Sequence, residues 1–343
     1  MPATTKSRAS RSSVSGRLAV ETLPPECDTH LWADYVETLC IASSDRYFTQ
    51  GDLLSRLKAR RDLGETPQRD SADDDEASNG EQRQAESFVP DQGDESFVRG
   101  LFEHLQYRAA SFQSAYPFEI NSRCDALGLR SNLTQKHKLY IFFLLSACHE
   151  RLGTNGPPIL RQFEQVSREA LRWMLPGLEV RLFGSGTTKC DYSGNKWKRI
   201  RALAADLCVE VKAKEHEFSK HDVGDSGLDL VAYTNFGDGA SHLLVVFGQC
   251  ACTPAWKTKQ YSSGPARWGN ILDFNVPPQN MLFVPYCLRE SSGRWYQQHE
   301  ISQTVMIDRI RLVKLLEKGG AVRLSKESSK IVEVTLSNHE PVF

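Results

Sequence analysis

The chain has 343 residues and a mass of 38.6 kDa, and its 42 Lys and Arg residues nearly balance 43 Asp and Glu, leaving a formal net charge of -1. This length can bury a sizeable core and suggests roughly two domains. The charge balance excludes a strongly basic protein, so any surface that binds nucleic acid must be local. Nine cysteines, an odd number with no Cys-x-x-Cys pair, argue against both a disulfide framework and a zinc ribbon. They fit a reducing cytosol better.

Residues 1–25 are rich in Ser, Thr, Arg and Lys and lack the apolar core of a secretory signal. We interpret them as a disordered basic tail, either simply solvated or in contact with phosphate groups. The apolar run at residues 139–145 is far shorter than the roughly 18 residues of a membrane span. The sequence therefore predicts a cytoplasmic protein with no membrane partner.

Apolar residues at helical spacing, such as Leu31 and Tyr35, predict a helical segment over residues 26–63. The same spacing returns over residues 97–155, which we expect to form a helical region. Between them, residues 64–96 are rich in acidic and small polar residues and have almost nothing to bury. They are interpreted as a disordered acidic linker.

Residues 156–343 are expected to form one α/β domain, because helical and strand patterns alternate along them. Helices are predicted over residues 160–174, 200–209 and 305–317. Strands are predicted over residues 179–183, 228–233, 242–250 and 281–287. Strand patterns that are largely apolar indicate burial on both faces, so the predicted fold class is α/β, with a central mixed β-sheet flanked by helices.

Two polar residues interrupt neighbouring strand patterns in this domain. Asp229 follows Gly227-Leu228 in one apolar run, and Gln249 lies near the end of the next. The Gly237-Asp238-Gly239 turn between the runs predicts adjacent antiparallel strands, so the two side chains should face each other. A buried acid is costly unless it is paired or binds a cation. A carboxylate beside a second oxygen ligand suits Mg²⁺, which activates water and polarises phosphate in phosphodiester hydrolysis.

The order of these motifs resembles that of the PD-(D/E)XK superfamily of restriction-endonuclease-like nucleases, closest to its Mrr-like branch. A helix that contains Phe163-Glu164 precedes the Gly227-Leu228-Asp229 strand, and the next strand carries Gly248-Gln249-Cys250. The resemblance covers about half of the chain, from Leu160 to Leu316. It implies a restriction-endonuclease-like core in which Asp229, Gln249 and Glu164 belong to the catalytic site and bind Mg²⁺, for which Mn²⁺ can substitute.

One position departs from the pattern of that family. Where the family has a lysine, two residues after Gln249, this chain has Ala251. The nearest substitutes are Lys257 and Lys259, at the predicted start of the next helix, and one of them is expected to complete the catalytic site. The alternative is that both lie on a solvated helix edge.

Each of the other site residues also has a purely structural interpretation. Asp229 can be a turn residue that binds backbone amides, and Gln249 can be a buried, hydrogen-bonded amide. Glu164 can simply complement a helix dipole. The pairing of Asp229 with Gln249 favours the functional interpretation of both.

A basic stretch with an aromatic residue offers a candidate nucleic-acid contact. Lys196, Lys198 and Arg199 flank Trp197. Cations at this density can contact phosphates, and the indole ring can stack on a splayed base. The alternative is a solvated helix start whose Trp197 packs on the core.

The function expected from the resemblance is a Mg²⁺-dependent endodeoxyribonuclease that hydrolyses DNA phosphodiester bonds in prokaryotic antiphage or restriction-type defence. A homodimer is expected, because double-strand cleavage by this fold usually uses two active sites. Two alternatives stay open. One is a catalytically degenerate subunit of the same fold that binds nucleic acid or serves in assembly. The other is an effector nuclease that is active only with a regulatory protein partner.

Overall fold

The computed structural model describes residues 28–62, 93–184, 190–219, 226–320 and 324–338, together with Leu18, Val20, Leu23 and Pro24. Almost all of the predicted basic tail and acidic linker therefore lies outside the described residues. A helix begins at Gly93, so the second helical region starts earlier than predicted. Within the described ranges, none of the helices combines the length and the apolar character needed to cross a membrane.

The first half of the chain is mainly helical and carries one small sheet. Its helices are α1 (Thr29–Ala42), α2 (Gln50–Asp62), α3 (Gly93–Phe112) and α4 (Gln135–Ala147). The sheet was not predicted, and its short strands pair antiparallel in the order β1-β3-β2. These strands are β1 (Tyr47–Thr49), β2 (Phe118–Ile120) and β3 (Ala126–Leu129). Runs of three or four residues show too little alternation to be recognised in a sequence.

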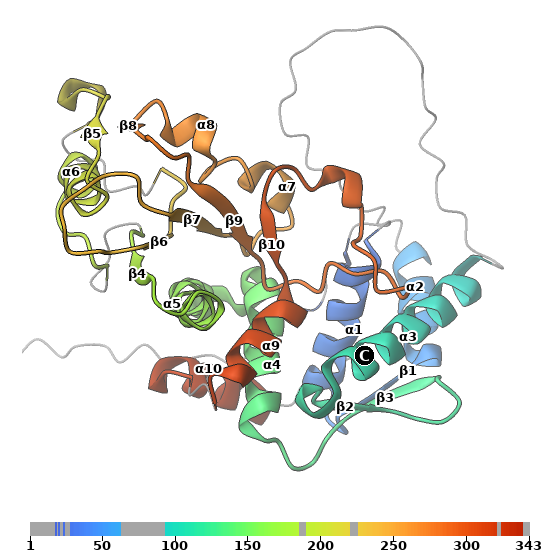
Figure 1. Cartoon of the computed structure of the whole chain (residues 1–343). Coiled ribbons are helices and arrows are strands. Elements are labelled where there is room, and N and C mark those ends of the chain that lie inside the picture. Colours follow the sequence, from blue (N-terminus) through green and yellow to red (C-terminus); the bar gives the residue numbers. More distant parts are fainter. Residues whose placement is uncertain are drawn as a thin grey trace, which may run out of the picture.

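The second half contains a five-stranded mixed sheet in the order β10-β9-β7-β6-β4. Its strands are β4 (Glu179–Leu182), β6 (Leu230–Tyr233), β7 (Val245–Cys250), β9 (Gln279–Phe283) and β10 (Val305–Ile307). β6 is antiparallel to both β4 and β7, whereas β7, β9 and β10 are parallel. Helices flank the sheet (Figure 1), so the predicted α/β class with a central mixed sheet is confirmed.

Two predicted elements near the C-terminus differ from the structure. β9 begins and ends earlier than the predicted strand at residues 281–287. The predicted helix over residues 305–317 is a strand, β10, followed by α9 (Arg309–Lys318). Asp308 separates the two, because its side chain accepts a hydrogen bond from the backbone N–H of Arg311 at 3.1 Å and caps the helix.

The two faces of the sheet are covered by different helices, because side chains alternate along each strand. On one face, Leu230 and Val246 belong to the same apolar cluster as residues of α4, α5 (Gly156–Met174) and α9. On the other, Val231 and Phe247 pack with residues of α6 (Lys196–Asp206) and α8 (Pro265–Trp268). The remaining elements are α7 (Trp256–Lys259), α10 (Lys326–Ser337), the paired strands β5 (Glu210–Val211) and β8 (Leu272–Asp273), and the 3-10 turns η1 (Gln113–Ala115), η2 (His149–Asn155), η3 (Glu215–Glu217) and η4 (Gln298–Glu300).

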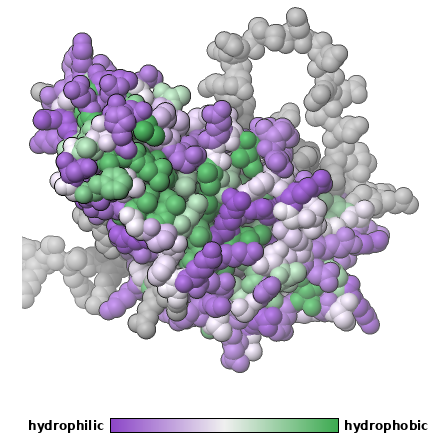
Figure 2. Space-filling model, in the orientation of Figure 1, coloured by the Kyte–Doolittle hydropathy of each residue, from purple (hydrophilic) through white to green (hydrophobic). Residues whose placement is uncertain are grey.

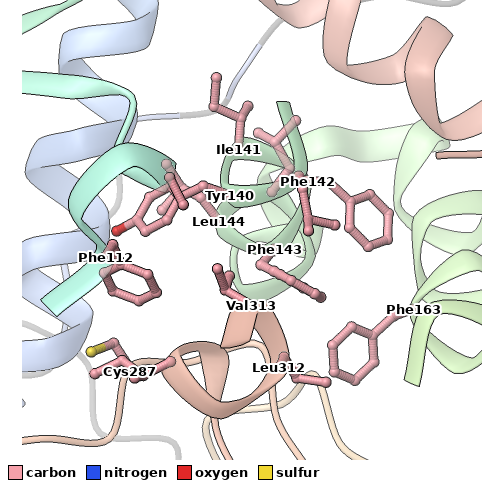
Figure 3. Close-up of a cluster of buried hydrophobic side chains, with 14 of the residues drawn as sticks. Phe112, Tyr140, Ile141, Phe142, Phe143, Leu144, Phe163, Cys287, Leu312 and Val313 are labelled. Carbon is pink, nitrogen blue, oxygen red and sulfur yellow. The ribbon is translucent and has the colours of Figure 1, made fainter. Parts of the chain in front are cut away.

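One large apolar cluster joins both halves of the chain. Figure 3 shows α4 residues from Tyr140 to Leu144 among Phe112 of α3, Phe163 of α5 and Leu312 of α9. On the face seen in Figure 2, apolar residues gather in the middle of the molecule with hydrophilic residues around them. The predicted domain boundary at residue 155 therefore does not separate two hydrophobic cores.

A buried ionic network crosses the same junction. Arg108 Nη1 lies 2.6 Å from Asp34 Oδ1 and 3.1 Å from Glu37 Oε2, and Arg309 Nη2 lies 2.8 Å from Asp34 Oδ2. The Tyr140 hydroxyl donates to Glu37 Oε1 at 2.9 Å. Burial raises the pKa of Glu37. At Asp34 burial also acts to raise the pKa, but the Arg309 and Arg108 guanidiniums outweigh it, so the pKa is lowered. Two carboxylates and two guanidiniums thus balance each other away from solvent.

Candidate functional site

Asp229 and Gln249 lie side by side at one end of the five-stranded sheet. Asp229 directly precedes β6, and its N–H donates to the carbonyl of Gly248 at 2.9 Å, so it continues the ladder that pairs Leu230 with Gly248. The Gln249 Nε2 group donates to Asp229 Oδ2 at 2.9 Å. Both residues are buried, with exposed fractions of 3% and 8%. The predicted contact between them across adjacent antiparallel strands is confirmed.

The Asp229 carboxylate fixes the orientation of the Gln249 amide. Asp229 Oδ2 accepts a second hydrogen bond from the backbone N–H of Cys250, at 2.6 Å. Because only the nitrogen of the Gln249 amide can donate to a carboxylate, its oxygen Oε1 is left for another partner. That oxygen is buried and accepts no hydrogen bond from the described residues. Leaving a buried acceptor unpaired costs about 1–3 kcal/mol, which makes this atom a candidate ligand atom.

A glycine and a serine close over this oxygen. Gly227 has a φ of +74°, and a Cβ at that position would lie 2.9 Å from Gln249 Oε1 and 2.3 Å from Ser262 Cβ. A left-handed backbone and this lack of space together require glycine two residues before Asp229. Ser262 lies on the turn after α7. No sequence signal predicted its place in the site, because that place depends on how the turn packs.

Glu164 reaches the same region from α5. Burial raises the pKa of the Cys250 and Cys252 thiols well above the usual range, and the carboxylates of Asp229 and Glu164 both add to the effect. Glu164 Oε2 also lies 3.6 Å from where a Cβ of Gly184 would be. The N–H of Gly184 in turn donates to the Asp229 carbonyl at 3.3 Å. Both carboxylates therefore lie close enough to the Cys250 thiol to act on its ionisation, which places Glu164 in the same region as Asp229.

The position that carries lysine in the family resembled is buried and apolar in this chain. Ala251 is 3% exposed and packs with Trp256. Lys257 lies on α7, and its Nζ is 3.7 Å from Glu300 Oε1 on η4. Lys259, on the same short helix, is exposed. Lys257 thus has an acidic partner other than Asp229 or Glu164, and Lys259 keeps its side chain on the surface.

Arg199, predicted as a nucleic-acid contact, lies in the interior. It has 0% exposure, and its guanidinium donates to the carbonyl oxygens of Phe183 and Gly184. The guanidinium also lies 5.1 Å from the centroid of the Phe183 ring. Arg199 therefore anchors α6 to the end of β4 next to Asp229 and offers no exposed surface to DNA. The sequence showed its charge but not its burial.

The other residues of the basic stretch lie closer to the surface. Trp197 is half-buried and stacks on Phe218, with ring centroids 5.7 Å apart. Its ring is therefore partnered within the chain, as in the packing alternative. Lys198 is exposed and Lys196 is half-buried. These two side chains stay candidates for phosphate contact.

The oxygen atoms gathered here fit a hard divalent cation. Mg²⁺ and Mn²⁺ take carboxylate and amide oxygens as ligands. Asp229 and Glu164 supply carboxylates. Gln249 Oε1, which accepts no hydrogen bond from the residues that the structure describes, supplies an amide oxygen. Over the described ranges, no group of three or more His, Cys, Asp or Glu side chains is arranged to hold a metal ion. A site here would therefore depend on the amide oxygen as well as on carboxylates.

Comparisons with protein-family models, with curated proteins and with solved structures found no match for this chain. The assignment of a function therefore rests on the arrangement of residues within the chain.

Proposed function

We propose that this chain is a divalent-metal-dependent endonuclease that hydrolyses DNA phosphodiester bonds at Asp229, Gln249 and Glu164. The observation that carries the proposal is the buried Gln249 oxygen, which accepts no hydrogen bond from the described part of the chain and lies beside a buried carboxylate. The element order supports it, since α5, β6 and β7 follow one another as the motifs do in the restriction-endonuclease-like family. A role in antiphage or restriction-type defence belongs to the same proposal and rests on analogy.

Each residue of the site has a distinct role in this proposal. Asp229 and Glu164 bind the cation through carboxylate oxygens, and Gln249 binds it through Oε1. A bound Mg²⁺ supplies the positive charge that stabilises a phosphate transition state and eases the ionisation of water. Asp229 also holds the Gln249 nitrogen, so that the oxygen of the amide is the atom presented to the cation. Gly227 lacks a Cβ, which would otherwise lie 2.9 Å from that oxygen.

A plasmid-nicking assay tests this function. Purified protein is incubated with supercoiled DNA in Mg²⁺, in Mn²⁺ and in EDTA. Asp229→Asn removes one negative charge but keeps the size of the side chain, and we expect nicking to fall about 100-fold or more. Asp238→Asn makes the same change at an exposed residue of the turn between β6 and β7 and should leave nicking unchanged. Metal-independent cutting, or full activity of Asp229→Asn, would refute the assigned site.

The same assay tests whether Lys257 or Lys259 takes part in cleavage. Lys257→Ala and Lys259→Ala are compared singly, with Lys318→Ala as an exposed lysine of α9. Loss of nicking in one α7 variant with unchanged thermal stability identifies the functional cation. If Lys257 serves instead to bind Glu300, its removal should change stability slightly and activity little.

A second candidate function is a nucleic-acid-binding or assembly subunit that has lost catalysis. The buried, apolar position of Ala251 favours it, because a lysine there would have to enter the packing around Trp256. Under this candidate the wild-type protein binds DNA in the presence of Mg²⁺ but does not nick it. An Ala251→Lys variant that gains nicking would show that only the lysine was lost.

A further inference from the structure

The turn that follows α7 carries an exposed aromatic residue one position before a residue of the candidate site. Tyr261 is 61% exposed, although it stands between the buried Gln260 and the half-buried Ser262. Ser262 is the residue whose side chain meets the backbone of Gly227, beside the Gln249 oxygen. Tyr261 is therefore the chain neighbour of a residue in the site, and its ring is exposed to solvent.

Hydrogen bonds on both sides of Tyr261 hold the turn in place. Gln260 is 1% exposed, and its Oε1 accepts from the N–H of Ser302 at 2.8 Å. Ser263 is also 1% exposed, and its hydroxyl donates to Asn280 Oδ1 at 2.8 Å. A ring carried on a fixed turn loses little conformational entropy when a ligand covers it. The exposed ring therefore needs little further ordering to bind a ligand.

The chain segment that carries the ring is basic, and one of its cations, Lys257, is paired with Glu300. From residue 251 to residue 272 the chain contains Lys257, Lys259 and Arg267 and no acidic residue. Lys259 and Arg267 are exposed. A free phosphate ion would not contact the aromatic ring, and an apolar protein surface would not pair with the cations. A nucleic-acid strand has both phosphates and flat bases, so it can contact the ring and the cations together.

We propose that Tyr261 stacks on an unpaired base of single-stranded DNA, while Lys259 and Arg267 contact the flanking phosphates. Every base has a π-face, so this contact tolerates any sequence, but in a duplex the bases are already stacked on each other. The inference rests on the proposed function and deepens it, because it names DNA with unpaired bases as the substrate class of the nuclease.

The test is a binding titration with a short fluorescent DNA single strand, carried out in EDTA so that metal-dependent cutting cannot occur. Tyr261→Ala should weaken the affinity about 5- to 100-fold, and Tyr261→Phe should keep it, because the phenyl ring still stacks. Phe236→Ala is the matched control. Phe236 is 72% exposed and follows the end of β6 opposite to Asp229. Its removal should leave the affinity unchanged.

Salt dependence separates stacking from phosphate contact. Tyr261→Ala should lower the affinity at every salt concentration without changing the slope of log affinity against log salt, whereas Lys259→Ala should make that slope shallower. Equal affinity of Tyr261→Ala and wild type would overturn the inference, as would an equal loss on a blunt duplex. Because this binding needs neither metal nor cutting, a protein that binds through Tyr261 but never nicks DNA would refute the proposed function alone.

Discussion

Gly227 meets two requirements at one residue, a left-handed backbone and the absence of a side chain. Gly237, on the turn between β6 and β7, has a similar φ of +70°, but a Cβ placed there would meet nothing within 4 Å. Alanine at either position has to adopt a left-handed backbone, which costs about 1–2 kcal/mol. Only in Gly227→Ala does the added methyl group also clash with Ser262 and Gln249. This overpacking lowers the free energy of unfolding by a further amount of about 1–3 kcal/mol.

We therefore expect Gly227→Ala to be less stable than Gly237→Ala in denaturant titrations and to lose nicking, while Gly237→Ala keeps it. Equal stability and activity of the two variants would show that the Gln249 oxygen is not closely packed. Binding of Mn²⁺ by the two variants provides a second measurement that does not depend on catalysis.

The site residues differ in how far the sequence could reveal them. Asp229 and Gln249 were predictable because a polar residue in an apolar strand is costly and therefore conspicuous. Ser262 was not, because its position follows from the packing of a turn that contains no unusual residue. Arg199 was assigned to the surface because charge is visible in a sequence and the carbonyl oxygens that neutralise it are not.

Elements were predictable where their pattern was long enough to define a period. α5 and β7 end at the predicted residues, although α5 begins four residues before and β7 three residues after the predicted start. Runs of this length show a clear helical or strand period. The residues of β10 were predicted as part of a helix because Val305–Ile307 continues the apolar spacing of α9. The cap residue Asp308 was the available signal for the boundary.

Two histidines lie where α1 and α3 meet the segment after β9. His30 packs against the rings of Tyr286 and Tyr296, and His104 Nδ1 lies 3.2 Å from Ser291 Oγ. Burial lowers the pKa of His30 from 6.5 to about 4, against the opposing charge of Asp28. Burial, assisted by Arg108, lowers the pKa of His104 from 6.5 to about 3.

These shifts predict a loss of stability in mild acid. Both rings are neutral in the folded protein, whereas the unfolded chain takes up protons below about pH 6.5. The contribution of each neutral histidine to the free energy of unfolding is therefore fully present above that pH. It is lost as the pH falls toward 4, by about 1.4 kcal/mol per pH unit for each histidine. His104→Gln should show a shallower decline in melting temperature between pH 7 and pH 5 than wild type. His299→Gln changes a side chain that is 80% exposed and serves as control; an equally steep decline in His104→Gln would contradict the assignment.

At the scale of the whole molecule, the buried network ties the N-terminal helices to the sheet. Arg309 connects α9 to Asp34 on α1, so removing it leaves a carboxylate buried with fewer cations. We expect Arg309→Met to destabilise the protein by about 3–5 kcal/mol. Arg294→Met removes a guanidinium that is 76% exposed and should change stability little. Calorimetry of wild type should show one transition; two separate transitions would indicate that the halves unfold independently.

The same network also affects the order in which the parts of the chain can fold. Asp34 and Arg309 stand 275 residues apart in the chain. Domains usually fold as units while synthesis proceeds from the N-terminus. Here the carboxylates of α1 lack one of their two cations until the segment that contains Arg309 has been synthesised. We therefore expect the N-terminal helices to reach their final packing only after α9 has been synthesised, because contacts between residues far apart in the sequence form slowly.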